Sequence, residues 1–244
     1  MTIDYYNIKL NDAITSPTIG DVFSACFDNN PSPTNPACTS IRRNPATGNL
    51  FGNVGTTPGL PLVLTNQGQI FTDGIDLVAN YSTDLGFAGL DLGFFGNWTN
   101  RSRFKANQDD QASLNRECVG YYSINCASLQ PEFSFTQRTT LSFDQVDLSL
   151  RWRFIDAVEV EPLVADAFLE DFRTIPSEHY FDLTAVFNVT DSFALTAAVI
   201  NLFDNEPKVV GSNIGSTAYN SGNVFPSTYD ALGRRYSVTA RMTF

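Results

Sequence analysis

The segment Gly233-Arg-Arg-Tyr-Ser-Val-Thr-Ala-Arg-Met-Thr-Phe244 decides the fold of this chain. Its apolar residues occupy every second position, and they are Tyr236, Val238, Ala240, Met242 and Phe244. The residues between them are polar or cationic, with Arg235 and Arg241 in step on that side. Because alternate side chains of a strand lie on opposite faces, the segment predicts a β-strand with one apolar face and one polar face.

The same alternation recurs along the chain and predicts eight strands. They lie at about residues 4–10, 67–81, 90–104, 133–143, 146–154, 181–189, 193–203 and 236–244. Four long connections alternate strictly with three short ones: the long ones are 11–63, 105–130, 157–178 and 204–232, and the short ones are 83–86, 144–145 and 190–192. Bacterial membrane barrels have short periplasmic turns and long outer loops, so the pattern places the four long loops outside the cell. In a β-sandwich the long and short connections need not gather at opposite ends of the strands, so this pattern disfavours a β-sandwich.

Two motifs precede the last strand. They are Asn201-Leu-Phe-Asp-Asn-Glu-Pro207 and Phe225-Pro-Ser-Thr-Tyr-Asp-Ala-Leu-Gly-Arg-Arg235. Followed by a strand that ends in Phe, this pair resembles the C-terminal end of the TonB-dependent receptors, the plugged outer-membrane barrels that import scarce nutrients into Gram-negative bacteria. The resemblance implies an all-β, antiparallel transmembrane β-barrel fragment, in contact with outer-membrane lipid and lipopolysaccharide. It also implies that the last strand, with Tyr236, Val238, Ala240, Met242 and Phe244, carries the signal read by the barrel-assembly machinery.

The composition agrees with this class and excludes others. The chain has 244 residues, of which 43% are hydrophobic, yet no apolar run approaches the roughly 18 residues that a membrane helix needs. A formal net charge of -11 argues against a nucleic-acid partner. Aromatic residues make up 13%, which suits the aromatic girdles of a membrane barrel.

The chain as written begins without an export signal, because Met1 leads directly into a predicted strand. We therefore expect residues 1–244 to be the C-terminal portion of a larger receptor, whose signal peptide, TonB box, plug domain and earlier strands are not in this sequence. Two alternatives stay open. One is a complete eight-stranded outer-membrane barrel with a structural or adhesive role, and the other is a secreted β-sandwich binding protein.

Four cysteines lie in two of the predicted outer loops. Cys26 and Cys38 are in the first loop, and Cys118 and Cys126 are in the second. Export passes through an oxidising compartment, which favours a local disulfide within each loop. The competing hypothesis, a metal site, usually requires tighter Cys or Cys/His spacing.

Charged residues on the polar faces of the strands are predicted to line the barrel lumen, since a cation on the lipid face costs about 2–4 kcal/mol at the bilayer midplane. They are Arg138, Arg151, Arg153, Arg235, Arg241, Asp76, Asp147 and Asp182. We expect them to pair with one another or with the plug rather than with a ligand. The third outer loop is acidic, with Glu159, Glu161, Asp166, Glu170, Asp171 and Glu178. These charges are predicted to be solvated, with a divalent cation or a cationic substrate as the alternative.

The sequence contains no nucleophile with a base, no phosphate loop and no dinucleotide fingerprint. We therefore expect no enzymatic activity and no cofactor. The predicted function is that of part of a receptor that binds a nutrient outside the cell and imports it with energy relayed by the TonB complex. The sequence does not identify the nutrient.

The first test concerns Phe244 in the full-length protein. Phe244→Asp, or deletion of Phe244, is expected to lower the amount of folded, heat-modifiable protein in the outer membrane without changing synthesis. The control is Thr243→Ser, on the opposite face of the strand, which should have almost no effect. Folded protein at the parent level in both Phe244 variants would show that this residue has no part in assembly.

Overall fold

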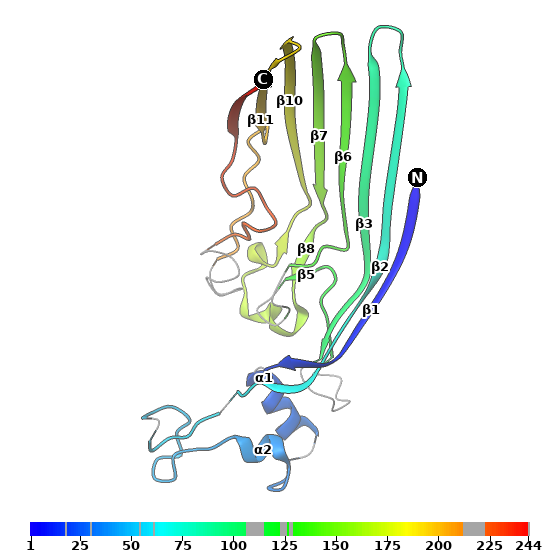
Figure 1. Ribbon diagram of the computed structural model, residues 1–244. Coiled ribbons are helices and arrows are strands. Elements are labelled where there is room, and N and C mark those ends of the chain that lie inside the picture. The colour runs from blue at the N-terminus through cyan, green and yellow to red at the C-terminus, as the bar shows by residue number, and fades with distance from the viewer. Residues whose placement is uncertain are drawn as a thin grey trace. The chain divides into compact units, whose positions relative to one another are not determined.

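The computed structural model describes residues 1–17, 19–29, 31–53, 55–60, 62–105, 115–122, 126, 129–211 and 223–243 (Figure 1). Phe244 and parts of the predicted outer loops lie outside the described residues. The chain forms two compact units, and it passes from one to the other within its first three long strands. Unit 1 comprises Met1–Tyr6, Asp73–Asn100 and Cys118–Phe244, and unit 2 comprises Asn7–Thr72 and Arg101–Glu117.

The main sheet contains eight long strands in the order β1-β2-β3-β6-β7-β10-β11-β12. Their bounds are β1 (Thr2–Thr15), β2 (Thr65–Asp84), β3 (Gly89–Lys105), β6 (Phe133–Ser142), β7 (Val146–Ile155), β10 (Glu178–Thr190), β11 (Phe193–Ile200) and β12 (Arg235–Met242). The pairings from β3 through β12 are antiparallel. The predicted eight strands and the all-β class are confirmed, and β1 and β12 are the two edges of an open sheet.

The three short turns of unit 1 lie at one end of its strands, the upper end in Figure 1. They are residues 85–88, 143–145 and 191–192, close to the predicted short connections. At the first turn, Asp84 Oδ1 accepts the N–H of Gly86 at 2.7 Å, and Gly86 has a φ of 85°, which suits glycine. Residue 243 comes back to the same end, where its N–H donates to Ser192 O at 2.9 Å.

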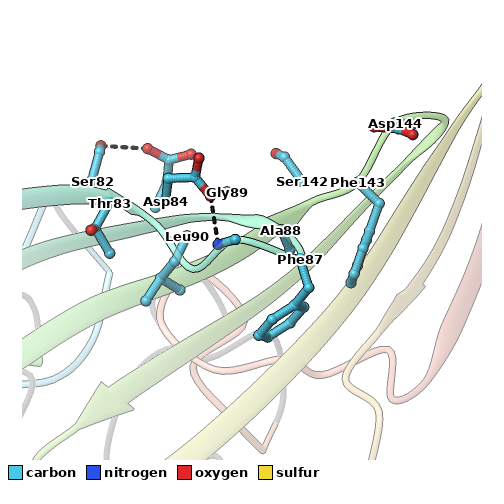
Figure 2. A pocket seen from close by; sticks show the side chains of 12 residues that line it. Ser82, Thr83, Asp84, Phe87, Ala88, Gly89, Leu90, Ser142, Phe143 and Asp144 are labelled. Carbon is cyan, nitrogen blue, oxygen red and sulfur yellow. Dashed lines mark hydrogen bonds between the residues drawn. The ribbon is translucent and has the colours of Figure 1, made fainter.

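An open hollow of about 590 Å³ lies between the first and second of these turns, and Figure 2 shows the side chains that line it. Three carboxylates line it, those of Asp84, Asp91 and Asp144. The first holds Gly86 and the second accepts the hydroxyl of Ser82. Both therefore stabilise the turn itself.

The strand registers separate the sheet of unit 1 into an apolar face and a polar face. Phe135 lies opposite Phe154, with ring centroids 5.2 Å apart, and Trp152 stacks on Phe181 at 5.7 Å. The adjacent positions Arg151 and Asp182 lie opposite each other on the other face. Because side chains alternate with a period of two, a slip of one residue would exchange the two faces.

A small second sheet and its core lie beyond the loop end of the strands in unit 1. The sheet contains β5 (Tyr121–Tyr122), β8 (Val158–Val160) and β9 (Thr174–Ile175). Two 3-10 helices, η3 (Pro162–Ala167) and η4 (Glu170–Phe172), lie between β8 and β9 in the chain. The buried core consists of Tyr122, Leu129, Val158, Val160, Ile175, Tyr180, Val210, Phe225 and Tyr229. The sequence predicted loops at 105–130 and 157–178, and it did not predict the short strands and the buried core that parts of these loops form. Strands of two or three residues are too short to give a recognisable alternation.

Unit 2 also contains regular structure where the sequence predicted a loop from residue 11. β1 continues to Thr15, and α1 (Ile19–Phe23), a π-helix η1 (Ser24–Asn29) and α2 (Pro36–Ser40) follow. Asn35 caps α2, because its side chain accepts the N–H of Ala37 at 2.9 Å. A further strand, β4 (Asn115–Glu117), pairs with the end of β3. None of the helices within the described segments is long and apolar enough to cross a membrane.

Both predicted disulfides are present. Cys26 bonds Cys38 with an S–S distance of 2.07 Å, and Cys118 bonds Cys126 at 2.02 Å. Each bridge closes a short segment within one loop, at separations of 12 and 8 residues. The pairings within each loop are confirmed.

The arrangement of loops and turns gives the second test. A cysteine introduced at Thr47 or Ala165 in the full-length protein is expected to react with a membrane-impermeant maleimide on intact cells, because both positions lie in predicted outer loops. One introduced at Ser192, which is exposed in a short turn, should react only after the cells are opened. Labelling of Ser192→Cys alone on intact cells would reverse the predicted orientation.

Candidate functional site

The centre of the polar face is the carboxylate of Asp182 on β10. Its side chain is only 5% exposed and lies between two guanidinium groups of β7. Arg151 Nε donates to Asp182 Oδ2 at 2.7 Å, and Arg153 Nε donates to the same oxygen at 3.2 Å. The other oxygen, Oδ1, accepts the backbone N–H of Asn201 at 2.8 Å. The buried charge is therefore paired and hydrogen-bonded, as burial requires.

A second buried carboxylate, Asp230, extends this group. It lies in the motif before β12, and its side chain is 3% exposed. Arg153 Nη2 lies 3.5 Å from Asp230 Oδ2, and Arg235 Nη2 donates to that oxygen at 3.1 Å. Arg153 also lies over the ring of Tyr180, 5.0 Å from its centroid. The result is a chain of alternating charges from β7 through β10 to the start of β12.

The first of the two motifs that precede β12 forms a tight turn around Asn201. This residue is fully buried and has a φ of 55°, a conformation that asparagine tolerates better than most residues. Its Nδ2 donates to Asn205 O at 2.9 Å, and the N–H of Asn205 donates to Asn201 Oδ1 at 2.9 Å. Asn205 Nδ2 donates to His179 O at 2.6 Å, which fixes the turn to β10.

The second motif binds the first through Asp204. The N–H of Arg234 donates to Asp204 Oδ1 at 2.7 Å, and Arg234 Nη2 lies 3.5 Å from Asp204 Oδ2. Gly233 has a φ of 66°, and a Cβ at this position would lie 2.9 Å from Asp204 Oδ1. The Asn-Leu-Phe-Asp and Tyr-Asp-x-x-Gly-Arg-Arg motifs thus form one structural element, which we call the motif junction (residues 201–205, 229–235 and the contacting residues Arg151, Arg153 and Asp182).

A hollow of about 420 Å³ lies beside this junction. It is lined by Arg153, Arg235 and residues 226–232. The two guanidinium groups share the carboxylate of Asp230 across it. Because these charges are already paired with each other, the residues around the hollow stabilise the contact between the strands rather than form an open binding site.

The predicted lumen-facing residues lie on the polar face, but only part of them join the junction. Arg138 lies opposite Arg151 in the register and donates through Nη1 to Ser149 Oγ at 3.1 Å. Asp76 accepts Asn97 Nδ2 at 2.7 Å. The registers place Asp147 and Arg241 nearer the turn end, opposite Ser142 and Ala194, away from the buried carboxylates.

The sequence did not identify Asp230, Asn201 or Asp204 as members of a charged network. Asp230 and Asp204 lie in a predicted loop, where a carboxylate is normally solvated. The sequence did contain one signal for their contact: all three residues lie in the two motifs that together carry the resemblance to the TonB-dependent receptors. The long separation of 77 residues between Arg153 and Asp230 hides the contact from any local pattern.

The acidic third loop differs from its prediction at one residue. Glu161 is 3% exposed and lies beside the small core, where its N–H donates to Tyr122 O at 3.2 Å. Burial raises the pKa of Tyr122 to about 12, so its hydroxyl keeps the proton that it donates to Phe172 O at 2.6 Å. Across the part of the chain that the structure describes, no three His, Cys, Asp or Glu residues are placed to hold a metal ion.

The predicted assembly residues of the last strand lie on the apolar face. Tyr236, Val238 and Met242 are exposed there, and Ala240 lies between the last two. Phe244, the fifth predicted residue, lies outside the described residues.

No protein-family model and no curated protein matches this chain. Solved structures do match. A mutant of the ferric enterobactin receptor PfeA from Pseudomonas aeruginosa has a TM-score of 0.58 and 12% identity over 99% of this chain and 29% of that chain.

Two further structures agree. The FrpB iron transporter from Neisseria meningitidis has a TM-score of 0.53 and 13% identity, and covers 99% of this chain and 28% of its own. The siderophore receptor PirA from Acinetobacter baumannii has a TM-score of 0.53 and 13% identity, with 99% and 29% covered. This chain therefore spans less than a third of the length of the receptors it matches. The predicted resemblance is confirmed at the level of fold: the chain has the fold of a part of the barrel of these receptors.

The third test measures the contribution of the motif junction to stability. Asp182→Asn removes the buried carboxylate that Arg151 and Arg153 share, although Arg153 keeps Asp230, and we expect it to lower the free energy of unfolding by about 2 kcal/mol or more. The loss is measured as a lower urea midpoint of the folded, heat-modifiable protein in detergent. Asp147→Asn, on the same face but outside the junction, is the matched control and should shift the midpoint little. Equal midpoints for the two variants would contradict a stabilising role for the junction.

Proposed function

We propose that this chain forms part of the wall of a TonB-dependent outer-membrane receptor, which binds a scarce nutrient outside the cell and imports it into the periplasm. The observation that carries the proposal is the open antiparallel sheet that has one mainly apolar face and one mainly polar face, and whose fold matches iron and siderophore receptors. An apolar outer face and a polar inner face are what a transporter barrel in a bilayer requires.

The apolar face supports contact with lipid because its aromatic rim has the chemistry of a membrane interface. Trp98 Nε1 donates to Glu132 Oε1 at 3.0 Å, and Trp152 Nε1 donates to His179 Nδ1 at 3.1 Å. Both tryptophans of the chain therefore have an apolar ring and a satisfied N–H near the loop end of the strands. Rings of this kind favour the boundary between lipid tails and headgroups.

The polar face would line the lumen. Arg138, Arg151, Arg153 and Arg235 are then partly open to water and to a plug domain. The motif junction holds the loop before β12 against β7 and β10. In this proposal, it positions the last strand for the barrel-assembly machinery, which reads the strand that ends at Phe244.

Barrel closure requires partners for both edges of the sheet. In a bilayer, unpaired backbone groups of β1 and β12 are costly, so closed barrels rather than open sheets span membranes. We propose that residues 1–244 are the C-terminal portion of a larger barrel, whose other strands pair with these edges. Closure of β1 on β12 would instead give the eight-stranded structural barrel, whose interior has room only for packed side chains.

The outer loops would bind the ligand, and a ferric chelate is the first class to test because the similar structures are named as iron and siderophore receptors. Two disulfides and the small core of Tyr122, Val158 and Ile175 hold parts of these loops in place. Ordered loops reduce the entropy lost on ligand binding. TonB, the plug and lipopolysaccharide are the partners that this function requires, and none of its steps is enzymatic.

The fourth test is an uptake measurement. Cells that lack the gene for the full-length protein are expected to lose growth on at least one ferric chelate as sole iron source, and to lose uptake of that chelate labelled with radioactive iron. The gene should restore uptake in cells with TonB and fail to restore it in cells without TonB. Unchanged uptake of ferric chelates, cobalamin, sugars and peptides in the deletion strain would contradict the import function.

A further inference from the structure

The first predicted outer loop contains a small helical part, which we call the first-loop cap (α1, η1, α2 and residues 31–43). The Cys26–Cys38 bridge joins η1 to α2. Asn35 Nδ2 donates to Ala25 O at 3.0 Å, while Oδ1 of the same side chain caps α2. A covalent bond and a side-chain cap therefore fix the shape of this part of the loop before any ligand arrives.

An open hollow of about 270 Å³ lies on the first-loop cap. Its lining is mainly apolar and consists of Phe27, Pro31, Pro33, Ile41 and the Cys26–Cys38 bridge, with Arg43 as its cation. The side chain of Phe27 is 57% exposed, so its ring is open to a ligand. A cavity of about 150 Å³ is enough to hold a benzene ring. Small-molecule sites typically combine an apolar lining with a few placed polar groups, and this hollow has that composition.

Arg43 supplies a fixed positive charge to the hollow. Its Nη1 donates to Gly48 O at 2.9 Å, which holds the guanidinium in place. A guanidinium has several N–H donors, and this contact uses a single one. Within the described part of the chain, no carboxylate pairs with Arg43, and none of the residues around the hollow is acidic. In a chain with a net charge of -11, this hollow is therefore a place that favours an anion.

The combination of apolar lining and free cation selects one class of ligand. An inorganic anion would leave the ring of Phe27 and the prolines exposed to water. An uncharged hydrocarbon would remove water from the guanidinium of Arg43 without replacing its hydrogen bonds. A flat ring with an anionic substituent satisfies both groups, because the ring covers Phe27 and the anion accepts from Arg43. A rigid ring also loses little conformational entropy on binding.

We infer that the first-loop cap binds the aromatic, anionic part of a ligand, with the ring against Phe27 and the anion on Arg43. The chemical class is an aryl carboxylate or a group of the same shape and charge. The inference rests on the proposed function in one respect, the place of this loop outside the cell. Binding to the purified protein does not depend on import.

Benzoate is the probe for the test, which uses the folded, full-length protein in detergent and saturation-transfer NMR. We expect benzoate to bind with a dissociation constant on the order of 1 mM, as befits a ligand of so few atoms. Benzamide has the same shape without the charge and should bind about tenfold more weakly. Cyclohexanecarboxylate has the charge without the flat ring and should bind about threefold more weakly than benzoate.

Two pairs of variants locate the site. Arg43→Gln is expected to weaken benzoate binding about tenfold, and its control is Arg42→Gln, the neighbouring cation outside the hollow. Phe27→Ala is expected to weaken binding about fivefold. Its control is Phe51→Ala, which removes another exposed phenylalanine of the same loop. All four side chains are exposed, so each variant should keep the heat-modifiable, folded form of the parent.

The outcomes separate this inference from the proposed function. Weaker binding in Arg43→Gln and Phe27→Ala, with parent-like binding in both controls, supports the site. Equal binding of benzoate and benzamide, parent-like binding in either hollow variant, equal losses in the controls, or no binding to the folded parent overturns it. The import function then still stands or falls on the uptake measurement. Loss of import with benzoate binding intact would overturn the import function and leave the site in place.

Discussion

The register between β7 and β10 is the constraint on which the rest of unit 1 depends. It places Arg151 opposite Asp182 on one face and Trp152 opposite Phe181 on the other. Each pair suits its own face: an ion pair where polar groups gather, and stacked rings where apolar groups gather. A slip by one residue would bring the carboxylate of Asp182 among aromatic rings, and a buried charge without a partner is strongly destabilising.

From this register the two ends of the strands acquire different roles. Turns of two to four residues close the hairpins at one end, where a single Asp–Gly contact is enough to shape the first turn. The connections at the other end are long and have gained their own stabilisation, from a small core around Tyr122 and from the Cys118–Cys126 bridge. Loops that are held in this way can present a binding surface while the sheet stays rigid.

The motif junction joins these two parts of the structure. Asp182 receives the N–H of Asn201, Asp204 receives the N–H of Arg234, and Asp230 binds Arg153 and Arg235. Three carboxylates thus fix both ends of the last long loop to the sheet. This explains in physical terms why Asn, Asp and Gly occupy these positions: Asn201 and Gly233 have a positive φ, and a side chain on Gly233 would collide with Asp204.

The sequence by itself determined the eight strands, their faces, the sorting of long and short connections and the two disulfides, because each of these leaves a signal within a few neighbouring residues. A period of two is visible in any strand of eight or more residues, and two cysteines in one loop have few other partners. Only the tertiary structure decided which charges meet. Arg153 and Asp230 are 77 residues apart, and the strands β5, β8 and β9 have two or three residues each, so neither the buried ion pairs nor the small core has a local pattern.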